Sequence, residues 1–432
     1  NDLNTTNHWG YVSTLGRVQA FTKNGWAFED GSSLGTQLSG TYTMNNAVYG
    51  LKSYDATEGN GYANFIYEKN WDGCTEEDYL GELTVGAEAN DHSHQEIIHK
   101  LSAGLSYQFN WLQENYKDRQ LMAEDLNGNM LKPEHIPGVF AQYSFNYGEK
   151  VSLVAGMRYD YNSYYNQHLY TPRLHLRYSP MKSITIRVSG GKGYRSPNLF
   201  AENIGLMASS RLLVVEGKIA MEEAWNYGLN YTQNIVLNSS NTLTLSLDYY
   251  RTDFVNQLII NQDRNFRNVF YYMSKDKSFS NSIQAEAKFS LFDAHWDLTL
   301  AGRYNDVRQN LDGNLIEKPY TSRWKALIVN NVRTNRSSWM FDLTTQFNGG
   351  VRLPNTNNTR PEYSKPYWIM HVQITKRFKY VDIYLGCENI LNQIQHDPII
   401  SPENPFSDNF DATIVYGSLM NRVFYLGVRL TI

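Results

Sequence analysis

Apolar and polar residues alternate over most of this chain. In an extended strand over residues 423–432, one face carries Phe424, Leu426, Val428, Leu430 and Ile432. The opposite face carries Tyr425, Gly427, Arg429 and Thr431. Because successive side chains of a β-strand point to opposite faces, this pattern predicts a strand with one apolar and one polar face. The same alternation recurs at residues 151–161, 184–188, 242–248, 283–291, 296–304 and 367–375.

Counting such segments predicts about seventeen strands. Their starts lie near residues 10, 34, 62 or 78, 97, 136, 150, 171, 183, 222, 242, 277, 296, 322, 338, 366, 379 and 421. Short connections fall at residues 179–182, 237–241, 292–295, 334–337 and 377–379. Long connections fall at residues 116–135, 196–221, 263–276, 353–365 and 394–420. We therefore expect antiparallel strands with short turns at one end and long loops at the other.

The segregation of charge predicts a transmembrane β-barrel. A Lys or Arg on a lipid-facing position near the bilayer midplane costs about 2–4 kcal/mol, so charges must share the face that points into the lumen. Many of the segments are also longer than the roughly 5–6 residues of an ordinary strand. Outer-membrane barrels have short periplasmic turns and long extracellular loops. With the C-terminus on the periplasmic side, every long loop of this chain is expected outside the cell.

Composition agrees with this fold class. The mean hydropathy of -0.51 is low, as expected when lipid-facing residues alternate with polar ones. The 32 Tyr, 19 Phe and 9 Trp suit aromatic belts at the membrane interfaces, although a large soluble β-protein is also compatible with them. A net charge of -4 argues against a nucleic-acid partner. Cys74 and Cys387 lack metal-ligand or redox spacing and are expected to be free structural residues.

Four segments resemble TonB-dependent outer-membrane receptors. The run GYRSPNLFAEN at residues 193–203 resembles the Arg-[Ala/Ser]-Pro-Asn-Leu segment of that family. MEEAWNYGLN at 221–230 is similar to its Pro-Glu-x-x-Trp-Asn-Tyr strand, and YLGCENILN at 384–392 to its Glu-Asn-Leu-Leu-Asn/Asp strand. Residues 417–432 resemble its closing hairpin, although Ile432 stands where many outer-membrane proteins carry Phe. The resemblance is most specific from about residue 136 onward.

The resemblance implies a 22-stranded barrel with a plugged lumen. It also implies an N-terminal plug that engages TonB. Because we find neither a plug-like region nor room for 22 strands, we expect residues 1–432 to be the C-terminal part of such a barrel, with the plug outside this chain. The implied function is active uptake of a scarce nutrient such as an iron chelate, haem or cobalamin, with a metal ion, glycan or peptide also open. A passive porin or an adhesin-like surface barrel is the alternative.

The candidate ligand site is the outer mouth near the end of the 183 strand. Arg195, Asn198, Glu202 and Asn203 combine charge and hydrogen-bonding capacity there, and long barrel loops commonly carry function. The structural alternative is that Arg195 and Pro197 end the strand and pin the following loop to the wall. Two polar stretches, at residues 263–267 and 355–360, are expected to be solvated loops.

The other sequence motifs give weaker indications of a functional site. His92, His94 and His99 cluster within nine residues, but no tetrahedral ligand set is completed, so a structural or solvated role is favoured over a metal or haem site. The Gly-rich run at 190–193 is expected to be a bend or a close-packing site. We find no catalytic motif, and predict a non-enzymatic protein without a cofactor or a bound metal.

Overall fold

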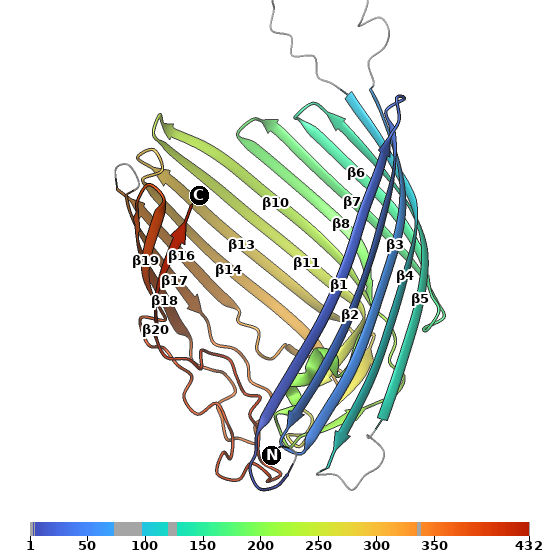
Figure 1. Cartoon of the computed structure of the whole chain (residues 1–432), viewed down its shortest axis with the longest axis vertical. Helices are drawn as coiled ribbons and strands as arrows, with labels where there is room; N and C mark the ends of the chain where they lie inside the picture. Colours follow the sequence, from blue (N-terminus) through green and yellow to red (C-terminus); the bar gives the residue numbers. More distant parts are fainter. Residues whose placement is uncertain (1–2, 4, 73–96, 120–127, 335–337, 432) are drawn as a thin grey trace, which may run out of the picture. The chain divides into compact units, whose positions relative to one another are not determined.

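The computed structural model describes residue 3 and residues 5–72, 97–119, 128–334 and 338–431. These residues form two compact units. The first unit comprises Asn1–Glu202 and Ala220–Tyr227, and the second comprises Asn203–Ile219 and Gly228–Ile432. Almost all regular structure in both units is β-strand (Figure 1).

The first unit is an antiparallel meander of eight strands, to which the start of β10 (Glu222–Asn238) is added. The strands are β1 (Tyr11–Ala27), β2 (Ser32–Tyr49), β3 (Lys52–Asp72), β4 (Ile97–Asp118), β5 (Gly128–Tyr147), β6 (Val151–Asn162), β7 (Gln167–Met181) and β8 (Ile184–Arg195). Each pairs with the next along the chain. This order follows from the short connections, which favour pairing of consecutive strands.

The second unit contains a similar meander with short additional strands. Its long strands are β11 (Asn241–Asn261), β13 (Ser278–Leu291), β14 (Trp296–Leu311), β16 (Trp324–Arg333), β17 (Trp339–Asn348), β18 (Tyr367–Arg377), β19 (Val381–Glu388) and β20 (Val423–Leu430). They pair antiparallel in this order. The short strands are β9 (Leu212–Val215), β12 (Asn268–Ser274) and β15 (Asn314–Glu317). β12 pairs with the end of β11 and, in parallel, with β9.

The predicted strand pattern is confirmed. When β9, β12 and β15 are set aside, seventeen long strands remain among the described residues. Two predicted starts were wrong: β3 begins at Lys52 rather than near 62 or 78, and β5 begins at Gly128 rather than near 136. In β3, the face that carries the exposed ring of Phe65 is polar nearer the start of the strand. There it carries Asp55, Thr57 and Gly59. The hydrogen-bonded strand therefore continues past the point where its apolar alternation stops.

The long strands of the second unit carry exposed apolar side chains on one face. On β20, Phe424, Leu426, Val428 and Leu430 are 59–73% exposed. Aromatic rings cluster toward both strand ends on this face, with Trp324 against Tyr304 and Trp368 against Phe347 at one end and Trp339 against Phe341 at the other. Exposed apolar bands flanked by aromatic rings are the lipid-contacting surface of membrane barrels. No helix among the described residues is long and apolar enough to cross a membrane.

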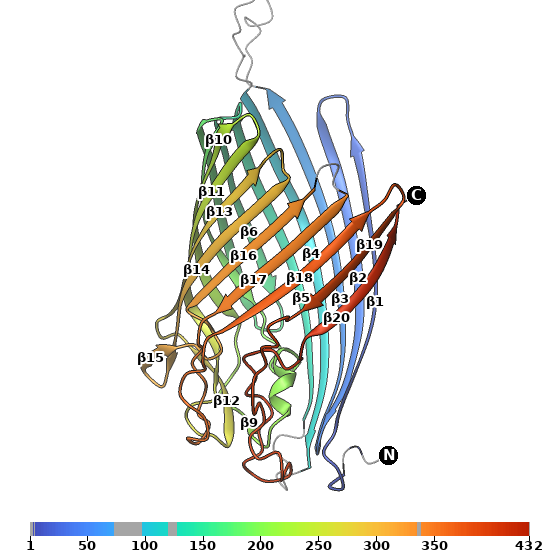
Figure 2. The ribbon, with the colours of Figure 1, turned by 90° about the vertical axis from the view of Figure 1, so that its left-hand side faces the viewer.

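The connections of the second unit differ sharply between its two ends, as predicted. Short turns at 292–295 and 378–380 lie at one end of the meander. The long connections, at residues 262–277, 312–323, 349–366 and 389–422, lie at the other end, together with β9, β12 and β15 (Figure 2). We call these connections together with residues 208–217 the loop layer.

Candidate functional site

The loop layer has a packed core of its own. Val351, Leu353, Ile400 and Ile414 are buried together, and Tyr320 and Tyr416 pack against them. Isolated β-bridges join Ser209 to Asp411, Arg352 to Tyr363 and Ile400 to Asp411. Long loops usually lie on the surface and move independently. Here they bury apolar side chains against one another, which holds their surface in one arrangement.

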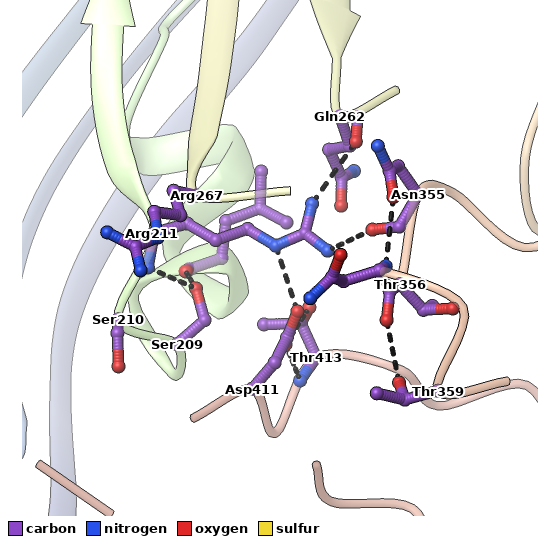
Figure 3. A network of polar contacts seen from close by, with 12 residues as sticks. Ser209, Ser210, Arg211, Gln262, Arg267, Asn355, Thr356, Thr359, Asp411 and Thr413 are labelled. Atoms are coloured by element: carbon purple, nitrogen blue, oxygen red, sulfur yellow. Dashed lines mark hydrogen bonds and ion pairs between the residues drawn. The ribbon is translucent and has the colours of Figure 1, made fainter. Parts of the chain in front are cut away.

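Arg211 is the cation in a network of polar contacts within this layer (Figure 3). Its guanidinium donates from Nε to Asp411 Oδ2 at 2.9 Å, from Nη1 to the carbonyl of Gln262 at 3.3 Å and from Nη2 to the carbonyl of Asn355 at 2.8 Å. Arg211 and Asp411 are only 3% and 4% exposed. The other oxygen of Asp411 accepts hydrogen bonds from the backbone N–H and the hydroxyl of Thr413. One buried cation thus ties four segments of the layer together.

A second arginine makes a similar connection. Arg352 donates from Nη1 and Nη2 to the two carboxylate oxygens of Asp263, at 3.0 and 2.8 Å, and from Nε to the carbonyl of Glu317 at 2.7 Å. Asn355 donates to the carbonyl of Asp263 at 3.1 Å. Two parallel N–H···O bonds between guanidinium and carboxylate fix orientation as well as distance. Arg352 therefore holds the 349–366 connection to two others.

Arg264 forms a third tie closer to solvent. It donates to Glu216 at 2.7 and 2.9 Å and to Asp312 at 2.5 and 3.0 Å, and the rings of Phe270 and Tyr272 lie beside it. The hydrogen bond from Arg264 lowers the pKa of Asp312, and the same contacts raise the pKa of Arg264. Residues 263–267 and 355–360 are loops with several exposed positions, as expected, but they also make contacts that the sequence did not predict. Asp263, Arg264 and Asn355 connect separate loops.

The predicted mouth residues lie in two different units. In the first unit, Arg195 donates from Nε to Glu222 Oε2 at 2.5 Å and from Nη1 to Glu202 Oε2 at 2.6 Å. The backbone N–H of Asn198 donates to Glu202 Oε1 at 3.0 Å. The structure thus brings Arg195, Asn198 and Glu202 together. Asn203 begins the second unit, where its backbone breaks the 3₁₀ segment η3 (Ala201–Met207) with φ -127° and ψ 24°.

Residues 196–202 form a strap that is fastened to neighbouring strands of the first unit. Lys132 donates to the carbonyl of Pro197 at 3.0 Å and to Asn198 Oδ1 at 2.9 Å. Phe200 is 4% exposed and stacks on Tyr116, with ring centroids 5.3 Å apart.

Two carboxylates of β4 and β5 also hold the strap. Ser196 donates its hydroxyl proton to Glu134, and the N–H of Ala201 donates to Glu114 Oε1 at 3.0 Å. All these contacts have the geometry of a loop pinned to the wall, while the side chain of Arg195 stays 55% exposed. The strap therefore combines fixed anchors with an accessible arginine.

The histidine cluster falls largely outside the described residues, which exclude His92 and His94. His99 lies in β4, where its Nδ1 is 2.7 Å from the hydroxyl of Tyr143 and its ring stacks on Trp71. Across the residues that the structure describes, no group of three or more His, Cys, Asp or Glu side chains is placed to hold a metal ion. Cys387 is a buried free thiol, and Cys74 lies outside the described residues.

Comparison with known families identifies the fold. The family model "TonB dependent receptor-like, beta-barrel" matches residues 1–390. The chain belongs to this family. Members are β-barrels of the outer membrane of Gram-negative bacteria, which confirms the predicted all-β transmembrane barrel and its location. They are receptors and transporters, in agreement with the prediction of a non-enzymatic protein. No curated protein matches the chain.

Solved structures share the fold of this receptor-family chain at low sequence identity. The unliganded ferric citrate transporter FecA is 11% identical, with a TM-score of 0.62 over 95% of this chain and 61% of that one. The Serratia marcescens haemophore receptor HasR, in complex with its haemophore HasA and haem, is 10% identical, with a TM-score of 0.66 over 97% of this chain and 66% of that one. A mutant of the Pseudomonas aeruginosa ferric enterobactin receptor PfeA is 14% identical, with a TM-score of 0.56 over 96% and 69%. The chain thus spans about three fifths of the length of the ferric citrate transporter.

Proposed function

We propose that this chain forms the barrel wall and the ligand-facing loops of an outer-membrane receptor that takes up a scarce nutrient actively through TonB. The observation that carries the proposal is the family match over residues 1–390, and the pre-organised loop layer supports it. A surface held in one arrangement loses less conformational entropy when it captures a ligand. The related structures include a ferric citrate transporter, a ferric enterobactin receptor and a haemophore receptor in complex with its haemophore and haem. Iron chelates and haem are therefore the first ligands to test, followed by cobalamin.

The proposed route to TonB is a plug encoded outside these 432 residues. The polar face of the second unit supports such a partner. Register places Arg303 directly opposite Lys325, an arrangement that like charges make unfavourable, and Arg303 donates to the neutral Gln284. A hollow of about 300 Å³ lies there, lined in part by Glu286, Arg303, Lys325 and Gln346. A polar plug with carboxylates at this position relieves the repulsion.

We further propose that Arg195, Asn198, Glu202 and Asn203 contribute to the ligand mouth. The contacts of Arg195 with two glutamates and of Asn198 with Lys132 orient these groups. The exposed side of Arg195 is then available to a ligand. Arg195→Gln in the intact receptor is expected to weaken ligand binding while the protein still assembles.

Growth of a deletion strain tests the transport function. The strain is supplied with ferric citrate, haem, another iron chelate or cobalamin as the single limiting source, with and without the restored gene and with and without TonB. The expected result is that one source supports growth only when both the gene and TonB are present. Growth that needs the gene and not TonB indicates a porin, and growth on every source without the gene excludes nutrient uptake. Sequencing upstream of Asn1 tests the plug separately, since a signal peptide immediately before Asn1 contradicts it.

A further inference from the structure

A pocket of about 250 Å³ lies inside the loop layer, between the 349–366 and 389–422 connections. Its fifteen lining residues include Arg360, Lys365, His396 and three tyrosines, Tyr363, Tyr367 and Tyr416, and none of the fifteen is acidic. It shares no residue with the strap or with the Arg211 contacts.

A buried glutamine and a tyrosine build the wall of the pocket. Gln395 donates from Nε2 to the carbonyl of Ile414 at 2.6 Å, and its Oε1 accepts the N–H groups of Tyr416 and Gly417 at 2.8 and 3.0 Å. The hydroxyl of Tyr367 donates to the carbonyl of Tyr416 at 2.9 Å. The Gln395 contacts hold the 389–422 connection to itself, and the Tyr367 bond joins that connection to the start of β18, directly after the 349–366 connection. The shape of the pocket is therefore set before any ligand arrives.

The positive charge at the pocket is not neutralised by a carboxylate partner. Arg360 donates to the backbone carbonyls of Thr359, Asp397 and Ile399, at 3.0, 2.8 and 3.2 Å. Carbonyl groups orient the guanidinium but carry no net charge. Lys365 is exposed, and the described residues offer it no ion-pair partner.

Burial raises the pKa of the Tyr363 hydroxyl, and two carboxylates outside the lining, Glu317 and Glu362, lie close enough to help raise it. Of these, Glu317 is already engaged. Glu317 accepts a hydrogen bond from the hydroxyl of Tyr363 at 3.2 Å, and the same oxygen is 2.6 Å from Nη2 of Arg323. Its charge is thus balanced by an arginine outside the pocket lining. The lining itself carries two cations, Arg360 and Lys365, and no carboxylate, which favours an anion.

The other lining residues indicate which uncharged group of a ligand the pocket can hold. Flat apolar surfaces come from three tyrosines and two prolines, namely Tyr363, Tyr367, Tyr416, Pro361 and Pro366. Tyr363 is 46% exposed. Aromatic side chains combine a large contact area with a polar tip. The volume is slightly below the roughly 300–1,000 Å³ of pockets that hold drug-sized ligands, so the pocket takes a group about one ring in size.

We propose that this pocket binds an anionic group carried on a ring, namely a carboxylate or phosphate attached to a sugar or aromatic ring. Lys365 contacts the anion at the open side, Arg360 supplies positive potential from the wall, and the tyrosines cover the ring. The assignment deepens the proposed receptor function and rests on it for its biological meaning. Binding itself is measured without transport, so the failure of one proposal is distinguishable from the failure of the other.

The test is isothermal titration calorimetry of the intact receptor, purified in detergent, with four ring probes. Benzoate and glucose 6-phosphate carry the anion, and benzyl alcohol and glucose are their neutral counterparts. We expect at least one anion to bind about tenfold more tightly than its neutral counterpart, because hydrogen bonds to charged groups contribute about 1.5–3 kcal/mol. Acetate and inorganic phosphate, which lack a ring, are expected to bind more weakly than the ring anion.

The matched variants are Lys365→Gln and Lys275→Gln, which remove one positive charge each from exposed positions of the same loop layer. Lys365→Gln is expected to weaken binding of the ring anion by about tenfold, and Lys275→Gln to leave it unchanged. Circular dichroism of both variants verifies that they fold like the parent. Equal affinity for charged and neutral rings, equal affinity for the ringless anions, or an unaltered affinity in Lys365→Gln overturns the proposal. Binding by carboxylate alone, by phosphate alone or by both supports it.

Discussion

Removal of the Arg211 side chain is expected to loosen the loop layer while leaving the strands intact. In Arg211→Ala, Asp411 keeps its bonds to Thr413 and loses its cation, and the carbonyls of Gln262 and Asn355 lose a donor. Breaking a buried ion pair from one side costs about 3–5 kcal/mol. At about 1.4 kcal/mol per tenfold change, the population of opened loops rises by roughly two to three and a half powers of ten. The strands keep their own ladder hydrogen bonds and should not unfold.

Hydrogen exchange measured by mass spectrometry separates these two effects. Peptides covering residues 208–217 and 394–420 should exchange much faster in Arg211→Ala, while peptides from β13 and β14 should remain protected. Arg267→Ala is the matched control, because Arg267 pairs with Asp408 at 3.2 Å with side chains 55% and 74% exposed, and such pairs contribute about 0–1 kcal/mol. Equal exchange in the two variants would refute the central role of Arg211.

Three further predictions concern other parts of the molecule. Phe200→Ala removes a buried ring that stacks on Tyr116, and this should lower local stability by about 3–5 kcal/mol. Hydrogen exchange at residues 196–202 should become faster. The control Phe292→Ala, at an exposed turn, should change little. Gly427→Ala places a Cβ against the ring of Tyr384 and should lower the temperature at which the barrel unfolds on heated gels. Gly302→Ala, where a Cβ meets open space, should not lower it. Equal unfolding temperatures in the two variants would contradict the steric argument. Because Arg264 lowers the pKa of Asp312 in the folded state below its unfolded value of about 3.9, the stabilising contribution of that pair is present above this value and is lost as the pH falls through the folded pKa. Proteolysis of the 262–277 connection should therefore accelerate below about pH 4 in the parent, and Asp312→Asn should be cut readily at pH 7 with less dependence on acid.

The strand pattern was predictable because the membrane imposes it locally. In β20 the apolar residues Phe424 to Leu430 recur at every second position, and a shift by one residue would move Arg429 to the lipid face. A bilayer tolerates neither an unpaired backbone group nor a charge at its centre. The number of long strands therefore follows from side-chain alternation, and their order from the short connections between them. The two wrong starts, in β3 and β5, lie where strands extend beyond the alternating pattern.

The boundary of β5 shows a second limit of local patterns. Pro133 and Pro137 lie within this strand, although proline lacks the N–H group of the ladder and is usually confined to edges and bulges. Pairing with β4 on one side continues from Tyr147 back to Gly128. Neighbouring strands thus extend β5 through residues whose own preferences are against it.

The sequence by itself determined an outer-membrane barrel wall, because alternation with a period of two and the family motifs are local properties of the chain. Only the tertiary structure decided what the loops do. Arg211 and Asp411 are 200 residues apart, and Arg352 and Asp263 are 89 apart. The residues around Asp263 by themselves predict only a solvated loop. These groups meet because the strand register delivers the ends of distant strands to one place. Burying a charged side chain there costs free energy unless an opposite charge pairs with it. The resulting ion pairs hold the loops as a single ordered surface.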